Sequence, residues 1–221
     1  MNLLNTKIIT IANQKGGCGK TTITMQLAGA LGKDAFKVLI VDADPQGTAT
    51  RWAANAEDSS PFPSHLAGLS AAGAKVHREI KKYIGLYDYI LIDCPPAVDS
   101  ATPQSSLMIS DLVLIPIIPS PADLWAAVGI QELIERIQQI NEGLKSRIIP
   151  NMCQTNVNLT QEVLEVLNGF GIEVSKTHLY LRTAYRQSAV LGKTVYDIKG
   201  ADKAIQEITA LKNEIIEILT I

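Results

Sequence analysis

Apolar, β-branched runs alternate with stretches of helical periodicity along this chain. The runs predict strands at Lys7–Ala12, Phe36–Val41, Tyr89–Ile92, Leu112–Ile118 and Arg147–Asn151. They are almost continuously hydrophobic, which is typical of strands covered on both faces. One of the helical stretches between them has an apolar face made of Ile130, Leu133, Ile134, Ile137 and Ile140. The pattern predicts an α/β fold, a doubly wound and mostly parallel sheet with helices on both faces.

Two prolines and one polar stretch interrupt this pattern. Pro116 and Pro150 lie inside two of the runs. Because proline cannot donate to a strand ladder, we expect them at strand ends or at a sheet edge. The stretch Asn55–Ser64 is polar and rich in turn residues, which favours a surface loop. There is no internal repeat and no long linker, so we expect residues 1–221 to form a single domain.

Composition narrows the class of protein. Hydrophobic residues make up 47% and charged residues 19%, a globular balance, and the net charge of −2 gives no overall attraction to nucleic acid. Any DNA binding must therefore come from a local patch. Three irregularly spaced cysteines fit a reducing cytosol better than a disulfide framework. The N-terminus lacks the features of a signal peptide and no apolar stretch approaches membrane-spanning length, so we expect a cytoplasmic protein.

The strongest chemical signal is a glycine-rich loop between the first predicted strand and a helix. It reads Gln-Lys-Gly-Gly-Cys-Gly-Lys-Thr-Thr over Gln14–Thr22. Glycines let the backbone wrap phosphate oxygens, and the helix N-terminus adds partial positive charge. We expect Lys20 to bind the β- and γ-phosphates and the Thr21 hydroxyl to ligate Mg²⁺. The residues expected around the phosphates are Gly16, Gly17, Cys18, Gly19, Lys20, Thr21 and Thr22.

Two of the predicted strands end in acidic residues. Asp42 and Asp44 follow the second run in Asp-Ala-Asp-Pro-Gln-Gly, and Asp93 follows the third in Asp-Cys-Pro-Pro. Carboxylates at the C-terminal ends of parallel strands face the crevice where ligands bind. Asp93 is therefore a candidate Walker-B aspartate that holds Mg²⁺, and Asp44 is placed to orient the attacking water. Such an aspartate is often only a turn former or helix cap, an alternative that two such ends beside a phosphate loop disfavour.

Together, Lys-Gly-Gly-Cys-Gly-Lys-Thr-Thr, Asp-Ala-Asp-Pro-Gln-Gly and Asp-Cys-Pro-Pro-Ala resemble the motifs of the ParA and MinD family of deviant-Walker-A P-loop ATPases. The resemblance covers essentially the whole chain, and it implies ATP and Mg²⁺ as cofactors. It also implies a homodimer with ATP sandwiched between the subunits, in which Lys15 reaches the partner's ATP phosphates. The implied catalytic residues are Lys15, Lys20 and Asp44, with Thr22 near the α-phosphate and with Thr21 and Asp93 on Mg²⁺.

Later segments resemble the ParA members of that family. Asn151 matches an asparagine that contacts adenine in relatives, although a structural turn asparagine is an equally good interpretation. Tyr180-Leu181-Arg182 stands where many relatives have Ile-Pro-Arg. The family's non-specific DNA binding uses basic residues late in the chain, which are here Arg182, Arg186, Lys193, Lys199 and Lys203. They could equally be ordinary solvated surface, as could a second strip made of Lys75, Arg78 and Lys82.

The leading interpretation is a ParA-type ATPase that partitions or positions a cargo with a ParB-like or other adaptor. A MinD-like membrane switch is the main alternative. It is disfavoured because the last helix, with Ile205, Ile208, Leu211, Ile215 and Leu219 on one face, has an acidic polar face. Two further alternatives are an iron–sulfur carrier, for which the cysteines lack paired spacing, and a metabolic P-loop ligase. The sequence leaves the cargo open.

Overall fold

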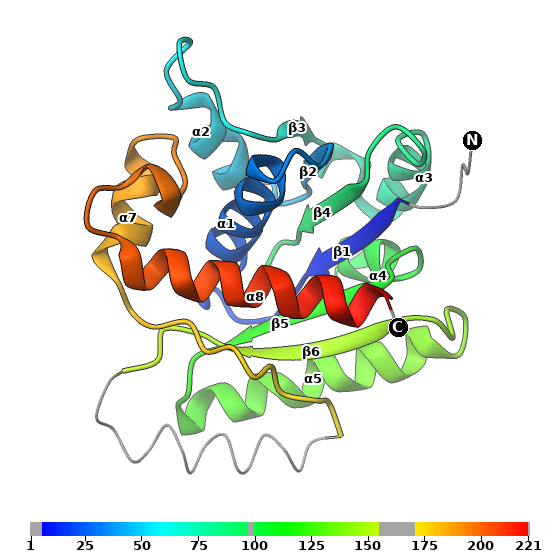
Figure 1. The fold of residues 1–221 in the computed structure, drawn as a ribbon. Helices are drawn as coiled ribbons and strands as arrows, with labels where there is room; N and C mark the ends of the chain where they lie inside the picture. The colour runs from blue at the N-terminus through cyan, green and yellow to red at the C-terminus, as the bar shows by residue number, and fades with distance from the viewer. Residues whose placement is uncertain (1–5, 97–99, 155–170, 221) are drawn as a thin grey trace.

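The computed structural model describes residues 6–96, 100–154 and 171–220. Within them, six strands form one parallel sheet in the order β3-β2-β4-β1-β5-β6 (Figure 1). The strands are β1 (Lys7–Ile11), β2 (Val38–Asp42), β3 (His65–Gly68), β4 (Tyr89–Asp93), β5 (Leu112–Ile117) and β6 (Lys145–Pro150). The α-helices are α1 (Lys20–Lys33), α2 (Thr48–Ala54), α3 (Val76–Lys81), α4 (Ala101–Leu107), α5 (Pro121–Gln138), α7 (Thr183–Val190) and α8 (Asp202–Thr220), and the 3₁₀ helices are η1 (Ser70–Lys75) and η2 (Val195–Asp197).

Helices cover both faces of the sheet, as predicted. Ile9 and Ile11 of β1 pack with α1 and α8 in one apolar cluster, whereas Ile8 belongs to a second cluster with α3, α4 and α5. This alternation of side chains along β1 is what a central strand requires, because successive residues point to opposite faces. Figure 1 shows α1 and α8 on the near face of the sheet and α5 beyond it.

The last helix packs into the core, which confirms its predicted role. Of the predicted stripe in α8, Ile208, Leu211, Ile215 and Leu219 are buried, and Ile205 is half-buried against the same cluster. Each buried aliphatic side chain of this size contributes about 1.5–3 kcal/mol. The stripe is therefore committed to the sheet rather than presented to solvent.

The strand order reverses around β1. After β1 the chain crosses to β2, β3 and β4 on one side, and then passes to β5 and β6 on the other. In open α/β sheets, ligands bind where the order reverses, at the carboxyl ends of the strands. The glycine-rich loop of residues 13–19 leaves β1 at this point and leads directly into α1.

Three details differ from the sequence expectations. The edge strand β3 follows the predicted loop directly and was missed, because His65–Gly68 is short, half-exposed and carries no apolar run. Ile140 was assigned to the apolar face of a helix, but α5 ends at Gln138 and the Ile140 side chain is 70% exposed. Pro150 ends the edge strand β6 as expected, whereas Pro116 is the penultimate residue of β5, which lies between β1 and β6.

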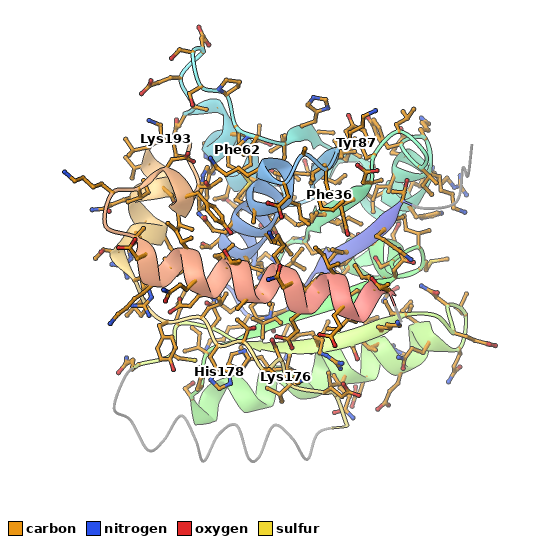
Figure 2. The ribbon with its side chains drawn as sticks, viewed as in Figure 1. Phe36, Phe62, Tyr87, Lys176, His178 and Lys193 are labelled. Carbon is orange, nitrogen blue, oxygen red and sulfur yellow. The ribbon has the colours of Figure 1, made fainter. Side chains whose placement is uncertain are left out.

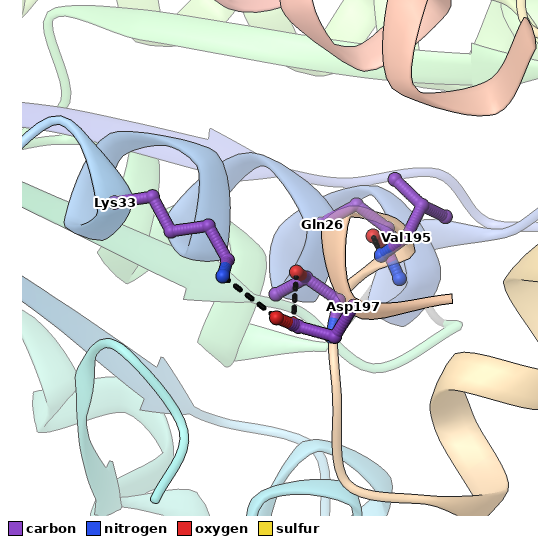
Figure 3. A network of polar contacts seen from close by, with 5 residues as sticks. Gln26, Lys33, Val195 and Asp197 are labelled. Atoms are coloured by element: carbon purple, nitrogen blue, oxygen red, sulfur yellow. Dashed lines mark hydrogen bonds and ion pairs between the residues drawn. The ribbon is translucent and has the colours of Figure 1, made fainter. Parts of the chain in front are cut away.

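The helix that leaves the phosphate loop is tied to the segment around α7 and η2 (Figure 3). The fully buried Gln26 of α1 donates from Nε2 to Ser188 Oγ (2.8 Å), and its Oε1 accepts from Val195 N (2.8 Å). Two turns further along α1, Lys33 Nζ donates to Asp197 Oδ1 (2.7 Å). Residues seven apart lie on one face of a helix, so Gln26 and Lys33 contact this segment from the same face of α1.

Candidate nucleotide-binding site

Two glycines give the loop before α1 its shape. Gly17 and Gly19 have φ angles of 76° and 93°, in the left-handed region that only glycine adopts without strain. At Gly19 a Cβ atom would also lie 2.2 Å from Asn151 Nδ2, so a larger residue would displace the Asn151 side chain. With its backbone curled in this way, the loop can present N–H groups to an anion at the N-terminus of α1.

The Lys20 side chain folds back over this loop. Its relative exposure is 7%, and Nζ donates to the Lys15 carbonyl oxygen at 2.9 Å. Cys18 Sγ donates to the same carbonyl at 3.3 Å. A phosphate oxygen forms a stronger, charge-assisted bond with an ammonium group than a neutral carbonyl does. Lys20 is therefore held where an incoming phosphate can take over its contact.

Asp93 and Thr21 bring β4 and α1 together beside the loop. Thr21 Oγ1 donates to Asp93 Oδ2 at 2.7 Å, while the other oxygen, Oδ1, is buried with no hydrogen-bond partner. Burial is the largest cause that raises the pKa of Asp93, to about 7, and nearby Asp42 adds to it while the Thr21 hydroxyl opposes it. A buried carboxylate oxygen without a partner is costly unless a cation binds it. The pair therefore fits Mg²⁺.

The two aspartates at the end of β2 have different surroundings. Asp42 is buried, and its carboxylate accepts from Thr50 N (2.8 Å), Thr50 Oγ1 (2.7 Å) and Asp44 N (3.3 Å). Asp44 is half-exposed, and its Oδ1 accepts from Gln46 N at 2.8 Å. Asp42 also pairs in register with Asp93 on the neighbouring strand. Asp42 thus holds the turn into α2, and Asp44 is the more exposed of the two carboxylates.

Asn151 closes the loop from the side of β6. It is buried, and its Nδ2 donates to the Cys18 carbonyl oxygen at 2.7 Å. This contact links the residue after the last strand to the phosphate loop. The predicted contact of Asn151 with adenine stays a prediction, since in this geometry its amide nitrogen is used by the loop itself.

Comparison with known proteins identifies the family. A family model described as "CobQ/CobB/MinD/ParA nucleotide binding domain" matches residues 9–195. This chain belongs to that family. The "Maintenance of carboxysome distribution protein A" of Halothiobacillus neapolitanus is 31% identical over 209 residues, covering 94% of this chain and 95% of that protein. The "Chromosome partitioning protein ParA" of Myxococcus xanthus is 29% identical, with 96% and 88% covered. A solved Cyanothece McdA–ATP complex has a TM-score of 0.80 at 19% identity, covers 96% of this chain and 97% of that one, and supports the fold.

For this ParA/MinD-family chain, the structure brings most of the predicted nucleotide-site residues to one edge of the sheet. Thr21 bonds Asp93, Lys20 bonds the loop carbonyl of Lys15, and Gly17 and Gly19 have the left-handed φ angles that a curled loop needs. Thr22 lies in the first turn of α1, and Lys15 is half-exposed in the loop. Sequence reasoning assigned no role to Asn13 or Asp42. Both are buried polar residues at strand ends, but the sequence does not reveal which neighbours they bond.

The five basic residues predicted to bind DNA differ in how far they are exposed. Arg182 forms an ion pair with Glu207 and stacks 5.4 Å from the Tyr180 ring centre. Lys193, seen near α7 in Figure 2, lies 3.6 Å from Glu57 Oε1. Arg186, Lys199 and Lys203 are exposed. These three side chains are therefore the better placed of the set for contact with a phosphate backbone.

The cysteines and the lengths of the helices bear on the iron–sulfur and membrane alternatives. Cys18, Cys94 and Cys153 are all buried thiols, and burial raises the pKa of Cys94 to about 12. A thiol of such high pKa is a weak nucleophile and a weak metal ligand at neutral pH. Over the described ranges, no helix combines the length and apolarity needed to cross a bilayer.

Proposed function

We propose that this chain is an Mg²⁺-dependent ATPase that dimerises around ATP and thereby positions or partitions a large cargo. One observation carries the proposal: a phosphate loop in which Lys20 is held over the backbone of a second lysine, Lys15, beside the Thr21–Asp93 pair. The second lysine is half-exposed, so part of it lies at the surface that another subunit would contact. The names of the relatives, which refer to carboxysome distribution and chromosome partitioning, support the positioning role.

On this proposal, each residue has a task that its position allows. The loop N–H groups and Lys20 bind the phosphates, and Thr21 with Asp93 would hold Mg²⁺, which neutralises phosphate charge when bound. Asp44 accepts a hydrogen bond from the attacking water and orients it toward the γ-phosphate. Thr22 would contact the α-phosphate, and Asn151 would lie near the base. We treat residues 1–221 as one P-loop ATPase domain.

The proposed dimer places Lys15 of each subunit against the nucleotide of its partner. A lysine contributed across the interface would stabilise charge on the transferred phosphoryl group, as an arginine finger does. Hydrolysis then depends on the dimer, and the monomer keeps ATP only as a bound ligand. Because hydrolysis requires the dimer, we expect slow intrinsic turnover and stimulation by an adaptor protein.

We further propose that the ATP-bound dimer binds DNA without sequence specificity, through Arg186, Lys199 and Lys203 and with smaller contributions from Arg182 and Lys193. Dimerisation doubles any such patch, which lets a chain of net charge −2 hold DNA only in the ATP state. The contacts of Gln26 and Lys33 with the 188–197 segment support a link between the phosphate loop and these residues. The ATP form would then be found on the nucleoid within the cytoplasm.

The membrane-associated alternative has less support. A MinD-like switch needs a free amphipathic helix, whereas the apolar residues of α8 pack against the sheet. Releasing α8 would expose at least four buried aliphatic side chains, each worth about 1.5–3 kcal/mol. The observations therefore favour DNA, rather than lipid, as the surface that the ATP form binds.

The proposal is tested by measuring mass and turnover on one preparation. With Mg²⁺ and ADP, light scattering should give the monomer mass of 23.9 kDa, and with a non-hydrolysable ATP analogue it should give twice that mass. Removal of Mg²⁺ with EDTA should abolish turnover. A protein that hydrolyses ATP as a monomer would contradict the proposed switch.

A further inference from the structure

Asn13, the second residue after β1, has a buried side chain whose amide is used at both ends. It is 2% exposed, its Nδ2 donates to the Pro116 carbonyl oxygen at 2.7 Å, and its Oδ1 accepts from the Lys15 backbone N–H at 3.2 Å. A carbonyl can only accept and a backbone N–H can only donate, so this environment fixes the orientation of the amide. Asn13 therefore joins the end of a strand to the start of the phosphate loop.

The first of these contacts depends on the proline in β5. The register of β1 with β5 ends at Ile11 and Leu114, and Ala12 N still donates to the Leu114 carbonyl. Pro116 lies two residues further along, so its carbonyl faces the same side and has no strand partner there. The Asn13 side chain takes that position in the ladder. Proline has no N–H with which to continue the ladder toward β1, and the paired register of β1 with β5 ends before it.

The second contact fixes Lys15. Its N–H is held by Asn13, and its carbonyl oxygen accepts from Lys20 Nζ at 2.9 Å and Cys18 Sγ at 3.3 Å. When a phosphate takes over the contact of Lys20, the bonds from Asn13 and Cys18 remain. A residue held at both its N–H and its carbonyl has little freedom in φ and ψ, so the direction in which the Lys15 side chain leaves the loop is set. A lysine side chain carries about 2 kcal/mol of rotamer entropy, and because the backbone is already fixed, only the side chain must be ordered on binding.

We propose that Asn13 is a positioning residue for Lys15, acting through the Lys15 backbone to direct the lysine toward the partner's nucleotide. This inference rests on the proposed function, because it requires Lys15 to act across the dimer. The active part of Asn13 is then its Oδ1 acceptor, whereas the bond from Nδ2 to Pro116 serves the fold. The two roles make separate predictions for two substitutions.

Asn13→Ala removes both bonds, and Asn13→Ser keeps an acceptor that can reach the N–H two residues later but is too short for Pro116. Loss of one hydrogen bond of ordinary strength should lower ATP turnover about three- to tenfold in Asn13→Ala. Asn13→Ser should recover most of that turnover while its melting temperature stays as low as that of Asn13→Ala. Affinity for Mg²⁺·ADP should stay within about twofold of the parent in both.

A double-mutant cycle with Lys15→Gln provides the decisive arm. If Asn13 acts through Lys15, adding Asn13→Ala to Lys15→Gln should cause no further loss of turnover. Equal losses on both backgrounds, or a turnover in Asn13→Ser as low as in Asn13→Ala, would show that Asn13 serves only the fold. A Lys15→Gln protein that dimerises and hydrolyses like the parent would overturn the proposed function itself. Asn13 would then have no functional lysine to position.

Discussion

Thr21 Oγ1 donates to Asp93 Oδ2 at 2.7 Å, and the second oxygen of that carboxylate is buried without a partner. The two residues are 72 positions apart in sequence, at the start of α1 and the end of β4. The neighbouring pairs β1–β4 and β2–β4 place this carboxylate in the centre of the sheet edge. Hydroxyl and carboxylate oxygens are ligands that Mg²⁺ prefers, so this pair fits the proposed Mg²⁺ site.

Replacing Asp93 with asparagine tests this site through pH. Burial raises the pKa of Asp93 from 3.8 to about 7, so the folded nucleotide-free protein keeps a proton that the unfolded chain releases. The free energy of unfolding of the parent should therefore fall between about pH 4 and pH 7 by an amount that Asp93→Asn does not share. In EDTA, the variant should gain melting temperature relative to the parent as pH rises through this window. Parallel melting curves across pH would contradict this prediction.

The same variant should lose its response to metal. Mg²⁺·ADP should stabilise the parent at about pH 8 by mass action and stabilise Asp93→Asn much less. ADP without Mg²⁺ is the matched control, because it leaves the carboxylate contact out of both measurements.

Asp44→Ala should impair hydrolysis while leaving the fold intact. The half-exposed Asp44 carboxylate accepts one local hydrogen bond, so its loss should change the free energy of unfolding by less than about 1 kcal/mol. Loss of a group that orients the attacking water should reduce turnover about 10²- to 10⁴-fold and trap an ATP-bound dimer. Asp42→Ala is the contrasting control, because it leaves the buried Thr50 contacts unmade and should mainly destabilise the protein. The prediction fails if Asp44→Ala neither binds ATP nor dimerises.

Much of this site follows from sequence because its residues are adjacent in the chain. The glycines, Lys20 and Thr21 lie within six positions, and a strand–loop–helix order is enough to orient them. Asp93 could be assigned because the ends of parallel strands meet at one edge of the sheet. Contacts such as Asn13 with Pro116, 103 residues apart, depend on strand order and register, which the sequence pattern does not give.

The strands show the same division. Five of them are long apolar runs and were predicted within about two residues at most ends. The exception is β3, whose four residues lie at the edge of the sheet and are held by pairing with β2 rather than by burial. Arg182 is a comparable case on the surface. Its charge is engaged by Glu207, 25 residues later, through packing of α8 that the sequence does not display.

Charge reversal tests whether the exposed basic residues contribute to DNA binding. Arg186→Glu with Lys199→Glu should weaken ATP-dependent DNA binding at least tenfold and reduce its salt dependence by about two counterions per subunit. Lys37→Glu, an exposed lysine before β2, is the matched control and should have little effect. Binding is measured by fluorescence anisotropy on two unrelated duplexes across a range of salt. Unchanged binding in the double variant would direct attention to Lys75, Arg78 and Lys82.

Gln26→Leu should weaken the link between the phosphate loop and the 188–197 segment. The substitution leaves Ser188 Oγ and Val195 N without their buried partner, at a cost of about 1–3 kcal/mol in the free energy of unfolding. Nucleotide affinity should change little, whereas the ratio of DNA affinity with ATP to that with ADP should fall. The exposed Gln206→Leu is the control. An unchanged ratio in a destabilised Gln26→Leu protein would show that this contact serves stability alone.

The central claim, that Lys15 acts on the partner's nucleotide, is tested most directly by mixing two variants that each retain only slow turnover. Lys15→Gln lacks the lysine that crosses the interface, and Asp44→Ala lacks the residue that orients water within its own subunit. In a mixed dimer, the Lys15→Gln subunit keeps its own Asp44 and receives Lys15 from the other. Half of the dimers in an equal mixture are mixed and each has one complete site, so turnover should recover to about a quarter of the parent rate. If Lys15 acts within its own subunit, no dimer has a complete site and the mixture will be as slow as its two components.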